Sequence, residues 1–203
     1  MWHMGETERA REFAEQAVQS AAELGHAPSS ANAYLYVTFL ETRRDAPAAA
    51  LRSAEMVHAL GREQGMDFFV ALGGILAGWA RGRLYDPEAA LTLINEALAI
   101  SQETEEHFSD PYLYRLRGDI LLKRDPADPV PGEDAYRTAI AIAKDQGARS
   151  FQLLAALALA KLYQSTGRPA EAHAVLAPAL EGFAPTPEMP EIAEAQALME
   201  RLA

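Results

Sequence analysis

GARSFQLLAALALAKLYQSTGRPAEAHAVLAPAL, residues 147–180, decides the fold of this chain, because it has the pattern of two amphipathic helices joined by a short turn. Leucine and alanine recur at helical spacing through its first half. Gly167, just past that half, predicts a left-handed helix cap, and Pro169 opens the second helix. A helical hairpin of this size leaves an apolar face uncovered, so we expect it to be one copy of a repeat.

The rest of the chain contains the same pattern at nearly constant spacing. Helix ends at Gly25, Gly65, Glu105 and Gly147 follow one another at steps of 40, 40 and 42 residues. The longer step includes the Pro-rich segment 125–132, which predicts a loop before a helix that starts at Glu133. Small residues recur where neighbouring helices would approach closely. Each repeat consists of a first helix and a second helix. On the second helices the small residues are Ala10, Ala50, Ala90, Gly132 and Ala172, and seven residues later Ala17, Val57, Ala97, Ala139 and Ala179. On the first helices they are Thr38, Gly78, Gly118 and Ala160.

This register predicts an all-α chain of ten helices without strands, organised as one repeat domain over residues 6–203. The expected elements are a lone helix 6–24, the helix pairs 28–65, 67–105, 110–147 and 149–183, and a C-terminal helix 188–203.

The composition excludes several classes of protein. The 203 residues include no cysteine, so we expect neither disulfides nor thiolate metal sites, which suits a cytoplasmic location. The longest uncharged run, residues 68–80, is too short to cross a bilayer. The net charge of −11 repels phosphate backbones and anionic lipids, so neither nucleic acid nor a membrane is an expected partner.

The small positions also carry a family resemblance. Leu159-Ala160, Tyr163, Gly167, Ala172 and Ala179 stand where the tetratricopeptide repeat (TPR) places its Leu-Gly, Tyr, Gly, Ala and Ala residues. The chain resembles the TPR family over almost its whole length, with repeats about six residues longer than the usual 34. This resemblance implies a right-handed α-α superhelix of about ten antiparallel helices.

A narrower resemblance concerns residues 59–65, 141–162 and 167–180, which look like the C-terminal TPR region of large bacterial regulators. In those proteins an AAA-type ATPase and a nucleotide cyclase or DNA-binding domain precede the repeats, and neither is visible here. The resemblance therefore implies either a fragment of such a regulator or a stand-alone relative.

The sequence contains no pattern typical of catalysis. No Gly-Lys-Ser/Thr follows Gly73-Gly74 or Gly78, and the five histidines form neither an i, i+4 pair nor a His-Glu-x-x-His motif. No serine-centred nucleophile elbow is present. We therefore expect a protein that is not an enzyme and binds neither cofactor nor metal.

One repeated position suggests a binding surface. Arg43, Arg83 and Lys123 recur at steps of 40 residues in the last turn of first helices, and Ser165 follows. The resemblance implies that this position, with others on the first helices, faces a concave groove. The candidate groove residues are Asn32, Phe39, Arg43, Trp79, Arg83, Tyr112, Arg115, Asp119, Lys123 and Lys161.

Such a groove would be aromatic and basic, which predicts an acidic or C-terminal carboxylate-bearing peptide as partner. Two alternatives stay open for these residues. The three recurring cations stabilise the negative end of the helix dipole without any ligand, and Trp79 and Tyr112 belong to the core.

These observations support three hypotheses. The first is a non-enzymatic protein- or peptide-binding TPR scaffold that uses its concave groove. The second is a regulatory sensor arm of a bacterial nucleotide cyclase or transcriptional regulator. The third is self-assembly, in which the terminal helices form a homodimer.

Overall fold

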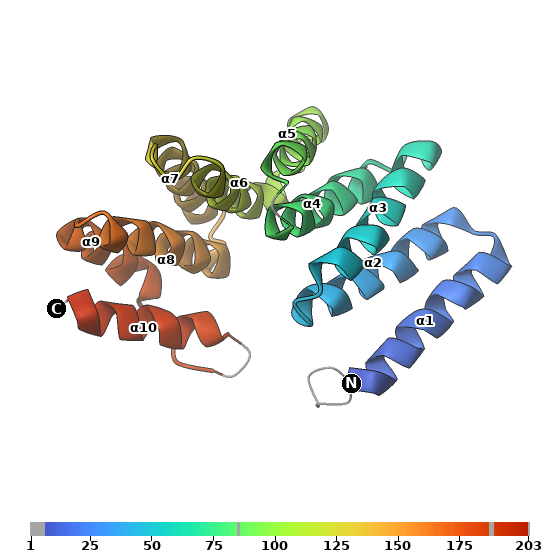
Figure 1. Cartoon of the computed structure of the whole chain (residues 1–203), viewed down its shortest axis with the longest axis horizontal. Coiled ribbons are helices and arrows are strands. Elements are labelled where there is room, and N and C mark those ends of the chain that lie inside the picture. Colours follow the sequence, from blue (N-terminus) through green and yellow to red (C-terminus); the bar gives the residue numbers. More distant parts are fainter. Residues whose placement is uncertain (1–6, 85, 187–188, 203) are drawn as a thin grey trace. The chain divides into compact units, whose positions relative to one another are not determined.

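The computed structural model describes residues 7–84, 86–186 and 189–202 (Figure 1). Within these ranges the chain is all-helical, as predicted, with ten α-helices and one short 3₁₀ helix. No strand occurs there, and a single β-bridge joins Thr186 to Met189. The helices divide into two compact units, unit 1 up to Glu105 and unit 2 from Glu106.

Unit 1 contains five helices that pack consecutively against one another: α1 (Thr7–Leu24), α2 (Ala27–Arg43), α3 (Pro47–Gln64), α4 (Asp67–Arg83) and α5 (Pro87–Thr104). The two first helices, α2 and α4, also contact each other. The core of this unit includes Leu35, Val57, Phe69 and Leu76.

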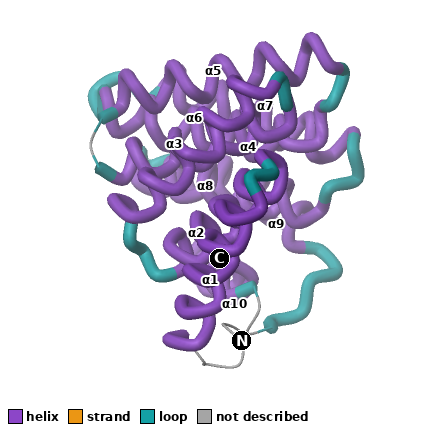
Figure 2. Tube along the Cα trace, turned by 90° about the vertical axis from the view of Figure 1, so that its right-hand side faces the viewer, coloured by secondary structure: helices purple, strands orange, loops and turns teal. Residues whose placement is uncertain are grey.

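Unit 2 starts with η2 (His107–Ser109) and contains α6 (Asp110–Arg124), α7 (Val130–Asp145), α8 (Arg149–Ser165), α9 (Pro169–Leu180) and α10 (Pro190–Leu202). Loops join the helices (Figure 2). Consecutive helices pack together, and α8 additionally contacts both α6 and α10. The first helices α6 and α8 and the C-terminal helix α10 therefore form a row, over a core that includes Leu153, Tyr163, Leu176 and Leu198.

The predicted helix ends are confirmed by the backbone. Gly25, Gly65 and Gly147 adopt the left-handed conformation, with φ of 62°, 64° and 66°. Glu105 occupies the equivalent place after α5 with φ of 57°, although it carries a side chain that resists this conformation. The 40-residue register therefore marks the same backbone geometry even where the glycine is missing.

The small residues are buried at helix contacts in most copies. Ala50, Ala90, Ala139 and Ala172 are fully buried, as the register predicts. In α1 the prediction is wrong for Ala17, which is exposed, whereas Ala21 is buried. Among the described helices, this one packs mainly against α2, so its buried face is narrow and turned relative to the expected one.

Most helix boundaries lie within two residues of the predicted ones, the ends predicted for the C-terminal helix, residues 188 and 203, lie outside the described residues, and two boundaries differ by three residues. α7 begins at Val130 rather than at Glu133, because Pro131 lies in the first turn, where a missing N–H leaves no hydrogen bond unmade. α9 ends at Leu180 rather than at residue 183, and Gly182 follows with φ of 80°.

None of the helices in the described ranges combines the length and apolar character that crossing a membrane requires.

Candidate functional site

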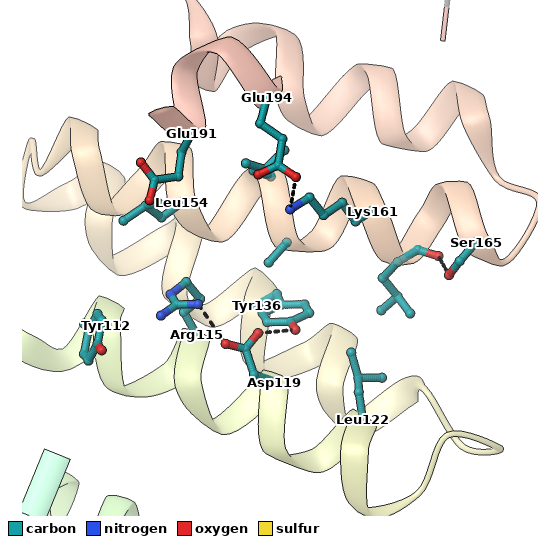
Figure 3. A pocket seen from close by; sticks show the side chains of 13 residues that line it. Tyr112, Arg115, Asp119, Leu122, Tyr136, Leu154, Lys161, Ser165, Glu191 and Glu194 are labelled. Atoms are coloured by element: carbon teal, nitrogen blue, oxygen red, sulfur yellow. Dashed lines mark hydrogen bonds and ion pairs between the residues drawn. The ribbon is translucent and has the colours of Figure 1, made fainter. Parts of the chain in front are cut away.

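Four of the ten candidate groove residues line one cavity of about 590 Å³ in unit 2. Tyr112, Arg115 and Asp119 reach it from α6, and Lys161 reaches it from α8 (Figure 3). The other lining residues are Leu122 from α6, Tyr136 from α7, Leu154, Leu157, Ala158, Leu162 and Ser165 from α8, and Glu191 and Glu194 from α10. We call this cavity the unit 2 groove.

Helical spacing explains why these side chains share the groove. Tyr112, Arg115 and Asp119 are three and four residues apart, so they lie on one face of α6. Leu154, Ala158 and Lys161 repeat this spacing on α8. Leu154, Ala158 and Leu162 are half-buried, and so they offer apolar contact to the groove while Leu153 fills the core.

A glycine on α6 lets Tyr136 reach the groove from the second layer of helices. A Cβ placed on Gly118 would lie 2.5 Å from Cε1 of Tyr136, so only a glycine lets this ring pack directly against α6. In that position the Tyr136 hydroxyl donates a hydrogen bond of 2.6 Å to Oδ1 of Asp119. The close contact of α6 with α7 thus orients a carboxylate in the groove.

The cations of the groove have carboxylate partners within the chain. Arg115 Nη1 donates to Oδ2 of Asp119 at 2.7 Å, and its guanidinium lies 5.1 Å from the ring centroid of Tyr112. Lys161 Nζ pairs with Oε1 of Glu194 at 2.7 Å (Figure 3). Both Asp119 oxygens are therefore engaged, and α8 is tied to α10.

Burial and charge act on the pKa values of these groups. Burial raises the pKa of Tyr112, and burial together with the negative charge of Asp119 raises that of Tyr136. Burial is the largest single effect on Arg115 and lowers its pKa, but Asp119, Tyr112 and Tyr136 together more than offset burial, so the pKa of Arg115 lies above its usual value. At neutral pH both phenols keep their protons and the guanidinium is charged.

In the groove lining, one nitrogen of Arg115 and the carboxylate of Glu191 have no hydrogen-bond partner among the described residues. Nε of Arg115 is buried and has no hydrogen-bond acceptor in the part of the chain that the structure describes. Glu191, which is half-buried, forms neither an ion pair nor a hydrogen bond with any described residue. The lining thus contains three carboxylates and two cations, whereas the sequence predicted an aromatic and basic groove.

The other candidate residues lie elsewhere. In unit 1, Asn32 donates a hydrogen bond to the carbonyl of Pro28 within its own helix, and Phe39 is exposed. Trp79 is half-buried in α4. In unit 2, Lys123 is exposed in the last turn of α6 and is not part of the groove lining. The side chain of Arg43 lies outside the described residues.

Arg83 has a role that the sequence did not suggest. Its Nη2 contacts Oδ1 and Oδ2 of Asp45 at 2.5 and 2.7 Å. Asp45 stands in the turn between α2 and α3 with φ of 51°. Arg83 therefore ties the end of α4 to this strained turn, in addition to lying in the last turn of its own helix.

A second polar cluster joins α7, α8 and the start of α9. The buried carboxylate of Glu133 accepts hydrogen bonds from Arg168 at 2.6 Å and from the hydroxyl of Tyr163 at 3.0 Å, and it pairs with Arg137 at 2.5 Å. The hydrogen bonds from Arg168 lower the pKa of Glu133. This cluster is fully paired and shares no residue with the unit 2 groove, so we assign it to stability.

The sequence missed the groove residues that come from outside the first helices. Tyr136 belongs to a second helix, for which the register predicted only core contacts. Glu191 and Glu194 follow the break at 185–190, across which the 40-residue register could not be carried. The one available signal was the short spacing of these two glutamates on the last helix, which places them on one face.

Metal ligation has no support among the described residues, since no group of three or more His, Asp or Glu side chains there could hold an ion. Compared with known proteins, the sequence matches no family model and no curated relative.

Proposed function

We propose that this chain is a non-enzymatic interaction module that binds an extended segment of a partner protein in the unit 2 groove. The observation that carries the proposal is the composition of the groove. Leu154, Ala158 and Leu162 offer apolar contact beside charged side chains in a cavity of about 590 Å³, within the size range of ligand sites.

The proposal includes the finer fold expected from the sequence, a TPR-like array with right-handed superhelical stacking. The left-handed residues at steps of about 40 and the buried small residues at helix contacts support repeated helix pairs. In such arrays the row of first helices presents a binding surface. The row α6, α8 and α10 lines the unit 2 groove in the same way.

The polar contacts support binding rather than catalysis. Asp119 is held by Arg115 and Tyr136, so neither of its oxygens is free to act as a general base. The raised pKa values of Tyr112 and Tyr136 keep both phenols protonated at neutral pH. Protonated phenols and paired ions can position a ligand through hydrogen bonds and packing.

A phage-displayed library of random dodecapeptides, selected on the full chain, tests this proposal. Ala158→Gln places a longer uncharged side chain into the groove, and we expect it to abolish binding of the enriched clones. Ala197→Gln is the matched control, because Ala197 is exposed on α10 and is not part of the groove lining. Circular dichroism melting of both variants verifies that the fold is kept. Failure to enrich clones, or clones that bind Ala158→Gln as well as the wild type, would overturn the proposal.

A further inference from the structure

We propose that the unit 2 groove selects segments that carry lysine or arginine, whose cation binds the carboxylate of Glu191. This inference rests on the proposed function and specifies its partner. It departs from the acidic partner that the sequence predicted, because α10 adds two carboxylates that the repeat register did not include.

An acidic segment would have to compete for cations that are already paired. To bind Arg115 it would displace Asp119 from a contact of 2.7 Å, and Asp119 would remain close by as a repelling charge. To bind Lys161 it would displace Glu194 from a contact of the same length. Either exchange replaces one ion pair by another, so it provides little net attraction.

Glu191 is the carboxylate of the groove that can gain a partner. It extends from the first turn of α10, and Glu194 extends from the same helix three residues later (Figure 3). Glu194 is paired with Lys161, whereas Glu191 has no ion pair or hydrogen bond to any described residue. Binding a cation at Glu191 therefore creates an ion pair in a half-buried place without breaking another one.

The surroundings of Glu191 suit the rest of a basic side chain. Leu154 and Ala158 line the same groove, and the methylene stem of lysine or arginine packs well on such apolar side chains. The chain's net charge of −11 also favours the approach of a cationic segment over an acidic one.

The first part of the test is the composition of the phage clones whose binding Ala158→Gln abolishes. We expect these dodecapeptides to contain more lysine and arginine than the unselected library. If they are enriched in acidic residues, or show no preference for basic ones, the lysine/arginine inference is overturned while the proposed function stands. If no groove-dependent clone exists, both fail.

The second part measures one enriched dodecapeptide, labelled with fluorescein, by fluorescence anisotropy. Glu191→Gln should weaken its binding by about 3- to 10-fold. Glu88→Gln is the matched control, because α5 and α10 both begin with Pro-Glu and Glu88 lies in unit 1; its affinity should stay within about 2-fold of the wild type.

Replacing the basic residue of the peptide by glutamine should cause a similar loss, and the two changes together should cost no more than either alone. Additive losses would show that the peptide cation does not bind Glu191 and would overturn the inference.

Discussion

The phenol of Tyr136 on α7 and the carboxylate of Asp119 on α6 are joined by a hydrogen bond of 2.6 Å. Asp119 binds Arg115 through its other oxygen, so this one contact connects the second layer of helices to the charged wall of the groove. The packing of the repeat and the geometry of the groove therefore depend on the same pair of residues.

Removing the Tyr136 hydroxyl isolates the energy of this bond. We expect Tyr136→Phe to lower the free energy of unfolding by about 1 kcal/mol, because Asp119 loses a donor while the ring packing is kept. Urea denaturation followed by circular dichroism measures the change. Tyr114→Phe is the control, since the Tyr114 hydroxyl has no hydrogen bond to any described residue, and it should be nearly neutral.

Adding one methyl group at Gly118 tests the close approach of α6 and α7. Gly118→Ala should destabilise the chain by about 1–3 kcal/mol, because the new Cβ would lie 2.5 Å from the Tyr136 ring. Gly74→Ala provides the comparison within another helix, where the nearest contact of the new Cβ is an ordinary 3.6 Å. That variant should gain up to about 1 kcal/mol from helix propensity. Equal effects on the melting temperature would contradict the packing model.

Placing a glycine at the end of α5, as at the ends of α1 and α3, should stabilise the chain. Glu105→Gly removes a side chain from a residue with φ of 57°, and we expect a gain of about 1 kcal/mol in unfolding free energy. Glu103→Gly, inside the last turn of the same helix, should instead cost about 1 kcal/mol. A loss of stability on Glu105→Gly would show that its side chain makes a compensating contact.

The buried carboxylate of Glu133 should make stability depend on pH. Its pKa in the folded chain is lowered from 4.5, so the stabilisation is complete above that pH and is lost as the pH falls through the folded value. At pH 7, Glu133→Gln should destabilise the chain by about 1–3 kcal/mol, since Arg137 and Arg168 lose the buried carboxylate that binds both of them, although Arg168 keeps its pair with Glu171.

The difference between wild type and Glu133→Gln should therefore shrink as the pH falls below about 4.5. Thermal unfolding at a series of pH values measures it. Asp134→Asn, on an exposed neighbour in the same helix, should change stability by less than about 0.5 kcal/mol. A difference that stays constant down to pH 3 would contradict a charged Glu133 in the folded chain.

The sequence predicted the helices well because their periodicity, caps and small residues are local signals. The 40-residue register placed a left-handed residue at Glu105 without a glycine there, and it placed Tyr112, Arg115, Asp119 and Lys161 on faces that share one groove. The first result follows from the repeat length alone, whereas the choice of groove positions came from the resemblance to tetratricopeptide repeats.

The charge of the groove could not be predicted in this way. It depends on how α10 packs against α8, and the Pro-rich break before α10 interrupts the register. The pairing of Arg83 with Asp45 was missed for a similar reason, because it joins helix ends 38 residues apart in the sequence. The ion-pair partners of long side chains depend on which residues lie nearby in the tertiary structure, and the repeat pattern does not contain this information.

The ion pairs inside the groove also affect the entropy of binding. Arg115 and Lys161 have many rotamers when free, but within the chain they pair with Asp119 and Glu194, which narrows the choice of rotamers. Ordering such a side chain on association typically costs about 0.5–1.5 kcal/mol. For the partner segment that we propose, this ordering accompanies folding, so we expect most of the remaining entropic cost to fall on the segment itself.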